Sequence, residues 1–310
     1  MVCMVLLFLL NNYAVFWLGV PQVAQTLTHM LGSASKPLDG EQFSQGLFAL
    51  GAYGAIIIVV IGFTLKKSAR SLQDDADLYS RLAAYVVRAA FWSVLLIGLA
   101  DMTISFLRVE NYLAAIAGQD LTTQLGRPIF RGLYVHYPLM VLSLIIAYFS
   151  KTLGFTWLTF LVVLAEFLIV VTRFVFSYEQ AFMGDLVRFW YAALFLFASA
   201  YTLVHEGHVR VDVLYASFSK RNKALSNVFG SLLLGLPLCW TILTQGMSGK
   251  GSSINSPLLS FEISQSGFGM YVKYLMAAFL LVFAVSMAIQ FTSSILSNIR
   301  DLSDPEARVS

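Results

Sequence analysis

Two histidines near the middle of the chain have the types and spacing that could support metal or haem chemistry. His205 and His208 are three positions apart, so a helix would place them on one face, as metal ligands require. The sequence offers no matching pair, because His29 is predicted in a loop and His136 at the start of a helix. We predict no cofactor and no metal. A haem-binding membrane anchor of a redox enzyme, with His136 as a further ligand, remains the alternative.

Two acidic residues, Asp101 and Glu166, lie inside apolar runs. An uncompensated charge at the centre of a bilayer costs about 2.5 to 3.5 kcal/mol on insertion scales. Arg173 shares a helix face with Glu166, but seven residues at about 1.5 Å each separate them too far for direct pairing. Two interpretations therefore stay open. The carboxyl groups form a proton or ion relay, or they make polar contacts within this chain or to a partner subunit.

The elements that position these residues are membrane-spanning helices. Of 310 residues, 58% are hydrophobic and only 12% are charged, whereas soluble domains carry about 25% charged residues. The composition predicts an all-α polytopic bundle of about eight transmembrane helices. The first is read as a retained helix, because it lacks the basic start and the cleavage pattern of a signal peptide. The runs long enough to span lie near 2–20, 43–64, 83–106, 133–150, 155–177, 184–204, 224–245 and 272–296.

Lysine and arginine clusters predict the orientation of these helices. The densest clusters lie at 66–81 and 210–223, and such clusters mark the cytoplasmic side. Both termini are then cytoplasmic. The longer connections at 20–43, 107–132 and 246–270 face outside. The location expected is a bacterial inner membrane.

The sixth predicted crossing ends in a dense polar cluster. His205, Glu206, His208, Arg210 and Asp212 arrive within eight positions, and valines alternate with several of them. Such a segment is costly in hydrocarbon but stable at the membrane surface, with valines toward the acyl chains and charges toward water. We predict an interfacial elbow here.

Motifs for catalysis and for a substrate site are missing from the sequence. It contains no phosphate-binding P-loop, no H-E-x-x-H and no G-x-S-x-G motif. Transporters with their own substrate site usually show paired, interrupted hydrophobic segments in two related halves, whereas here only Pro237 interrupts a crossing. We predict a protein that is not an enzyme and has no translocation site of its own.

Residues 172–230 resemble the DctQ-type small membrane subunit of tripartite ATP-independent periplasmic (TRAP) transporters. In order, the region has Arg173 and Phe174 ending one helix, the acidic Asp185, an alanine-rich helix and the block HVRVDVLY at 208–215. Glu262, Lys273 and Gln290 further along the chain are also similar. The resemblance covers roughly residues 155–300, so residues 1–150 form a four-helix extension that many members lack, and 301–310 form a cytoplasmic tail. The acidic position departs from the family, which commonly has Glu there.

The resemblance implies a scaffold role. A large membrane subunit would carry the moving transport domain and the ion sites, and a periplasmic binding protein would deliver the substrate through contacts with the outer connections 107–132 and 246–270. The substrate class implied is a carboxylate or other organic anion, taken up with a cation gradient. A self-sufficient carrier is the competing interpretation.

Several residues are candidates for structural, interface or lipid contacts in this scaffold. Arg173 and Asp185 are expected to form an opposite-charge contact across the outer turn between two helices. Residues His208, Arg210 and Asp212 are expected to fix the elbow by bonds to lipid phosphate or helix ends, or else only by local folding. Glu166 is a further candidate for a structural or interface contact. The predicted contacts to lipid headgroups are Lys220, Arg221 and Lys223.

Overall fold

The structure is a computed structural model and describes residues 1–33, 37–66, 71–151, 154–204, 215–264 and 269–303. Every regular element in these ranges is a helix, and no strand occurs among them. The prediction of an all-α polytopic bundle is therefore confirmed. The chain divides into two compact units, Met1–Asp75 and Ala76–Ser310, which are described separately.

The first unit contains α1 (Val2–Trp17), α2 (Val23–Met30) and α3 (Gly40–Lys66). Both shorter helices contact α3. Gly46 of α3 allows α2 to approach closely, because a Cβ atom there would lie 2.0 Å from the Thr26 hydroxyl oxygen. Thr26 is accordingly fully buried, although most of α3 is exposed.

The second unit is built around three long helices. These are α4 (Leu72–Val109), which begins at the end of the first unit, α10 (Ala181–Val204) and α14 (Lys273–Ser303). The remaining helices are α5 (Leu113–Ala117), α6 (Gln119–Leu125), α7 (Pro128–Arg131), η1 (Gly132–His136), α8 (Tyr137–Phe149), α9 (Phe155–Phe176), η2 (Tyr215–Ser217), α11 (Lys220–Gly230), η3 (Ser231–Gly235), α12 (Leu236–Gly246) and α13 (Asn255–Ser260).

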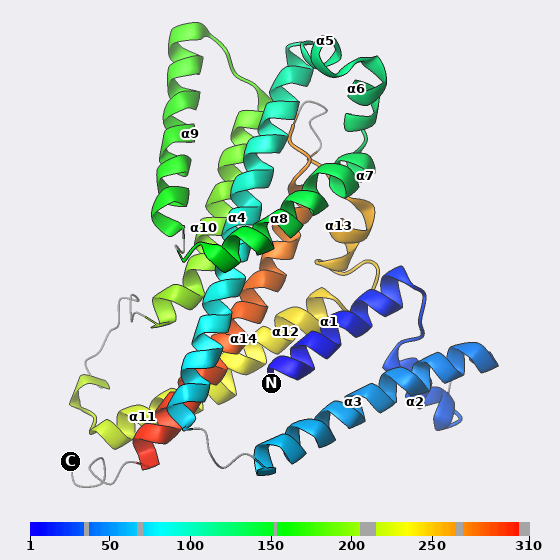
Figure 1. Cartoon of the computed structure of the whole chain (residues 1–310), viewed down its shortest axis with the longest axis vertical. Helices are drawn as coiled ribbons and strands as arrows, with labels where there is room; N and C mark the ends of the chain where they lie inside the picture. The colour runs from blue at the N-terminus through cyan, green and yellow to red at the C-terminus, as the bar shows by residue number, and fades with distance from the viewer. Residues whose placement is uncertain (34–36, 67–70, 152–153, 205–214, 265–268, 304–310) are drawn as a thin grey trace. The chain divides into compact units, whose positions relative to one another are not determined.

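Helix α10 packs between α9 and α14, and α14 also contacts α11 and α12 (Figure 1). The α10–α14 contact is aromatic: Phe279 lies 5.2 Å from Phe189 and 5.0 Å from Phe197 between ring centroids. Trp190 of α10 packs on Gly98 of α4, where an added Cβ would lie 2.5 Å from the indole nitrogen. These contacts bury one face of α10 against both long neighbours.

Two short π-helical turns precede prolines. Pro138 follows η1 by two residues, and Pro237 follows η3 at the same spacing. Proline has no backbone N–H to donate to the preceding turn, and the helix widens there. Pro237, which interrupts a predicted crossing, thus has a structural explanation. The widened turn η1 ends at the fully buried His136.

Seven helices among the described residues are long and apolar enough to cross a membrane, and they correspond to the second to eighth predicted crossings. The first predicted crossing is present as α1, an apolar helix of 16 residues. This is slightly shorter than the roughly 17 to 25 residues that usually span a bilayer. The predicted elbow at 205–214 lies outside the described residues.

The packing separates the chain at residue 75, whereas the sequence suggested an extension 1–150 followed by a region 155–300. The two divisions describe different properties. One is the density of contacts, and the other is the expected extent of a family region. Helices α4 to α8 belong by contact to the same unit as α9 to α14. The sequence-based division stays a prediction.

Candidate functional site

Asp101 is a fully buried carboxylate two turns before the end of α4. Its Oδ1 atom lies 2.9 Å from Nη1 of Arg131 and 3.1 Å from Nε2 of His136. Its Oδ2 atom accepts a hydrogen bond of 2.6 Å from the backbone N–H of Tyr271. An ionised carboxylate can persist in such a buried place because paired donors replace the water it has lost.

The cation of this pair, Arg131 at the end of α7, is also fully buried. Its Nε donates to the carbonyl oxygen of Leu125 at 2.9 Å, and Nη1 donates to the Ser105 hydroxyl at 3.2 Å. The guanidinium carbon lies 3.9 Å from the centroid of the Tyr271 ring. Stacking and several hydrogen bonds suit the flat guanidinium of arginine, so lysine would not substitute here.

His136 uses both ring nitrogens within the protein. Nδ1 lies 2.9 Å from the Tyr274 hydroxyl, and Nε2 faces Asp101. In this arrangement neither nitrogen is open to haem iron. His205 and His208, the other proposed haem ligands, lie outside the described residues. Within the described ranges, no group of three or more His, Cys, Asp or Glu side chains is placed to hold a metal ion.

Asp185, in the first turns of α10, binds the backbone of Met270, the residue before Tyr271. Its Oδ2 atom accepts from the backbone N–H of Met270 at 3.0 Å and from the Ser264 hydroxyl at 2.9 Å, and Oδ1 lies 3.3 Å from Arg188. Asp101 and Asp185 therefore hold two consecutive backbone amides just before α14 begins. We call these two carboxylates and the amides of Met270 and Tyr271 the carboxylate clamp.

The expected contact between Arg173 and Asp185 is wrong. Arg173 instead pairs with Glu179 at 3.3 Å, and both of these side chains are more than half exposed. The physical reason is that the two side chains point in different directions. Asp185 points into the bundle, where its side chain is only 10% exposed, whereas Arg173 is exposed on the outer side of α9. Glu179 lies in the turn between the two helices and reaches Arg173 first.

Glu166 contrasts with Asp101. It is exposed in the middle of α9, whose most apolar stretch is only 6% buried. Its neighbours Val163, Phe167 and Val170 are also at least half exposed. No partner for the Glu166 carboxylate occurs in the described part of the chain, so its partner must come from outside it, or the group is neutral.

The stretch from α9 to α14 matches a known protein family. Residues 160–301 match the family described as tripartite ATP-independent periplasmic transporters, DctQ component. This region, somewhat less than half of the chain, is similar to the DctQ component of that family. The resemblance seen in the sequence is confirmed, and with its seven candidate spans the chain is a multi-pass membrane protein. No curated protein and no solved structure matches the chain.

The DctQ region runs from α9 to near the end of α14 and includes Asp185, Met270 and Tyr271. Asp101, Arg131 and His136 precede it. The carboxylate clamp therefore joins the DctQ region to the helices before it. Those helices also bury the ion pair between Asp101 and Arg131. The DctQ region adds a further partner for Asp101, the backbone N–H of Tyr271.

The predicted lipid contacts open α11 of the DctQ region. Lys220 and Arg221 are exposed, and Lys223 Nζ lies 5.6 Å from the centroid of the Tyr215 ring. Three cations in the first turn oppose the helix dipole, which favours anions at a helix N-terminus. An anionic headgroup would remove this conflict, so the lipid contact stays a prediction. The elbow residues named with them, His208, Arg210 and Asp212, lie outside the described residues.

Sequence reasoning missed the role of Arg131, which lies in the predicted outer connection 107–132. It also missed that Tyr271 joins the two outer connections, because its hydroxyl accepts from Arg108 and donates to the carbonyl oxygen of Gly126 at 3.0 Å. One signal was available. An aspartate inside an apolar run needs a cation, and Arg131 lies next to a predicted helix start at the same outer end, although Arg108 and Arg127 are nearer along the chain.

Proposed function

We propose that this chain is the small membrane subunit of a TRAP transporter and serves as a non-catalytic scaffold for the large transport subunit. The family match supports the subunit type. The observation that carries the scaffold role is Glu166: a carboxylate in the middle of a spanning helix, exposed, and without a partner among the described residues. In the assembled transporter, a hydrogen-bond donor or cation on a helix of the large subunit compensates it.

Helix α9 suits such a contact. Its main contact with the long helices of the second unit is with α10 (Figure 1). Large apolar side chains, among them Trp157, Phe160 and Phe167, are exposed on the rest of its surface. The apolar surface of a docking helix supplies the contact area with its neighbour. The single carboxylate supplies a polar contact that fixes the position of the two helices along each other. A moving transport domain requires a neighbour held in such a fixed position.

The outer connections support the second predicted contact, with the periplasmic binding protein. Tyr271, directly after the connection 246–270, bonds to both Arg108 and Gly126 of the connection 107–132, so the end of one connection is tied to the other. Tyr112 and Ile116 are exposed on it. We propose that the binding protein, carrying a carboxylate or another organic anion, docks on this surface and that a cation gradient drives uptake through the large subunit.

Co-purification with the large subunit from the same source tests the proposal. Replacing Glu166→Leu is expected to weaken the association about tenfold, as for the loss of an interhelical polar contact in a membrane. Glu166→Gln, which keeps the hydrogen-bonding atoms, retains more of it. Leu164→Ala is the matched control, because this exposed residue lies about 200° around α9 from Glu166.

The possible results of this experiment test the proposed function and the contact through Glu166 separately. If the unaltered chain does not associate with the large subunit, the proposed function is wrong. If it associates but Glu166→Leu binds as well as the unaltered chain, the function stands and the contact through Glu166 is wrong. Self-association that depends on Glu166 would assign this face to a second copy of the chain.

A further inference from the structure

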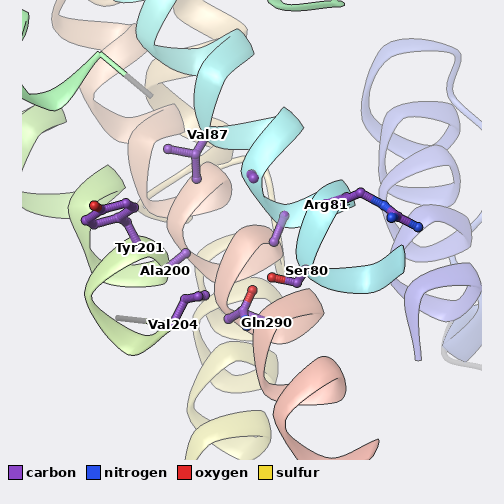
Figure 2. Close-up of a pocket in the computed structure, with 9 residues that line it drawn as sticks. Ser80, Arg81, Val87, Ala200, Tyr201, Val204 and Gln290 are labelled. Carbon is purple, nitrogen blue, oxygen red and sulfur yellow. The ribbon is translucent and has the colours of Figure 1, made fainter. Parts of the chain in front are cut away.

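A pocket of about 190 Å³ lies between α4, α10 and α14 (Figure 2). Small and apolar side chains form most of its wall. Only Ser80, Arg81, Tyr201 and Gln290 contribute polar side chains. The complete lining is Ser80, Arg81, Ala83, Ala84 and Val87 of α4, Ala200, Tyr201 and Val204 of α10, and Gln290 of α14.

Gln290 is the residue that makes this pocket more than a packing defect. Its side chain lines the pocket, and the residue is only 6% exposed. Its amide has no hydrogen-bond partner among the described residues, and the same is true of the Ser80 hydroxyl on the facing helix. The amide is open to the pocket, and a polar group against a mostly apolar wall is stabilised by a hydrogen bond, so a group with an acceptor is expected opposite it inside the pocket.

Arg81 does not fill this role. Figure 2 shows its side chain extending away from Gln290, and the residue is exposed. A water could bridge Gln290 and Ser80, but it would leave the alanine and valine side chains that form most of this wall without an apolar partner. The occupant therefore combines an apolar chain with a hydrogen-bond acceptor.

A second groove gives a direct contrast. It has a volume of about 380 Å³ and lies between α4, α8, α10 and α14. Its hydroxyl groups are already bonded: Tyr85 donates to the carbonyl oxygen of Leu144 at 3.1 Å, and Ser93 bonds to Ser143. This larger groove can be filled by any hydrocarbon. The smaller pocket has polar groups that hydrocarbon leaves unpaired.

The position of the pocket indicates the source of its occupant. Val204 is the last residue of α10, so the pocket lies where this spanning helix ends. Helix α11, which begins with Lys220, Arg221 and Lys223, packs against the same helix, α14, that supplies Gln290. The ends of spanning helices lie at the level where lipid ester groups and headgroups replace hydrocarbon.

We propose that this pocket binds one phospholipid of the bilayer. The ester carbonyl accepts hydrogen bonds from the Gln290 amide and the Ser80 hydroxyl, and an acyl chain lies along Ala84, Val87 and Ala200. This site is independent of the contact between α9 and the large subunit. The bound lipid fixes α4, which precedes the DctQ region, against two helices of that region.

Lipid retention tests the proposal. The full chain is reconstituted in nanodiscs of equal parts phosphatidylethanolamine and phosphatidylglycerol, extracted in mild detergent, and its bound lipids are counted by native mass spectrometry. One retained phospholipid is expected. Gln290→Leu keeps the side-chain volume but removes the amide, and is expected to lower retention about fivefold.

Two filling variants give a matched pair. Ala84→Phe occupies the smaller pocket and should displace the lipid, whereas Ala278→Phe occupies the larger groove and should not. Equal lipid retention in the unaltered chain, Gln290→Leu and Ala84→Phe would overturn the proposal. So would a lipid lost only in Ala278→Phe.

Adding oleate instead of phospholipid to delipidated protein distinguishes a free carboxylate from an ester. Oleate binding that competes fully with phospholipid and depends on Gln290 would assign the pocket to fatty acids and overturn the phospholipid assignment. Failure of oleate to compete supports it. Neither outcome depends on the large subunit, so this test is separate from that of the proposed function.

Discussion

Asp101 and Glu166 are acidic residues in similar apolar runs, yet the structure gives them opposite surroundings. Asp101 is fully buried and has three partners, Arg131, His136 and the amide of Tyr271. Glu166 is exposed on α9 and has none among the described residues. A buried and paired charge holds one protein together, whereas an exposed and unpaired one in a membrane indicates a surface that another protein covers.

The largest effect is expected from breaking the buried pair. Asp101→Ala leaves the Arg131 cation buried and uncompensated, and should destabilise the protein by about 3–5 kcal/mol. Thermal unfolding and the yield of monodisperse protein in detergent measure this loss. Glu166→Ala should leave both unchanged when this chain is studied alone.

The double variant Asp101→Ala with Arg131→Met shows how much of the loss in stability comes from leaving the Arg131 cation without a partner. It removes the uncompensated charge, so it should be more stable than Asp101→Ala alone. If the double variant is less stable than the single one by the full cost of each change, the buried contact between these residues is not the source of the effect.

A smaller effect is expected at the other carboxylate of the clamp. Asp185→Ala leaves the buried N–H of Met270 without its acceptor and removes the shorter of two hydrogen bonds of the Ser264 hydroxyl, at a cost of about 1–3 kcal/mol. Thermal unfolding should show a clear decrease in Tm. Ser264→Ala is the control and should have the weaker effect, because the backbone N–H keeps its bond to Asp185.

A double-mutant cycle tests the corrected pairing at the outer turn. Arg173 and Asp185 have separate partners, so the effects of replacing them with alanine should add. The cycle between Arg173 and Glu179 should give only about 0–1 kcal/mol of coupling, because both side chains are largely exposed. Strong coupling between Arg173 and Asp185 would restore the contact expected from the sequence.

The smallest expected effect is a change with pH in the stability that Tyr178 contributes. Partial burial, together with a hydrogen bond of 2.7 Å to Glu110, raises the pKa of Tyr178 to about 12. The neutral phenol is thus favoured in the folded protein, and its contribution is complete below pH 10 and lost as the pH rises toward 12. The difference in Tm between the unaltered chain and Tyr178→Phe should shrink over this interval. A constant difference would contradict the contact.

The spanning helices could be predicted from the sequence because apolar length alone defines them, and seven were placed correctly. The DctQ region was recognisable because its polar residues follow a fixed order between helices. The partners of Asp101 could not be predicted, since Arg131 and Tyr271 are 30 and 170 residues away and only packing brings them together.

The directions in which the side chains point could also not be predicted from the sequence. Asp185 and Arg173 are close along the chain, but the turn between α9 and α10 points one inward and the other outward. The same limit applies to Gln290, which the sequence marked only as a family feature. Its burial beside a pocket depends on α4, a helix from more than 180 residues earlier in the chain.

We propose that this chain is a fixed scaffold and that the large subunit moves the substrate. Substrate uptake into vesicles tests this directly, with the binding protein and a cation gradient present, comparing this chain alone, the large subunit alone and both together. Full uptake is expected only when both membrane subunits are present. Gradient-driven uptake by vesicles that contain this chain as their only integral protein would contradict it.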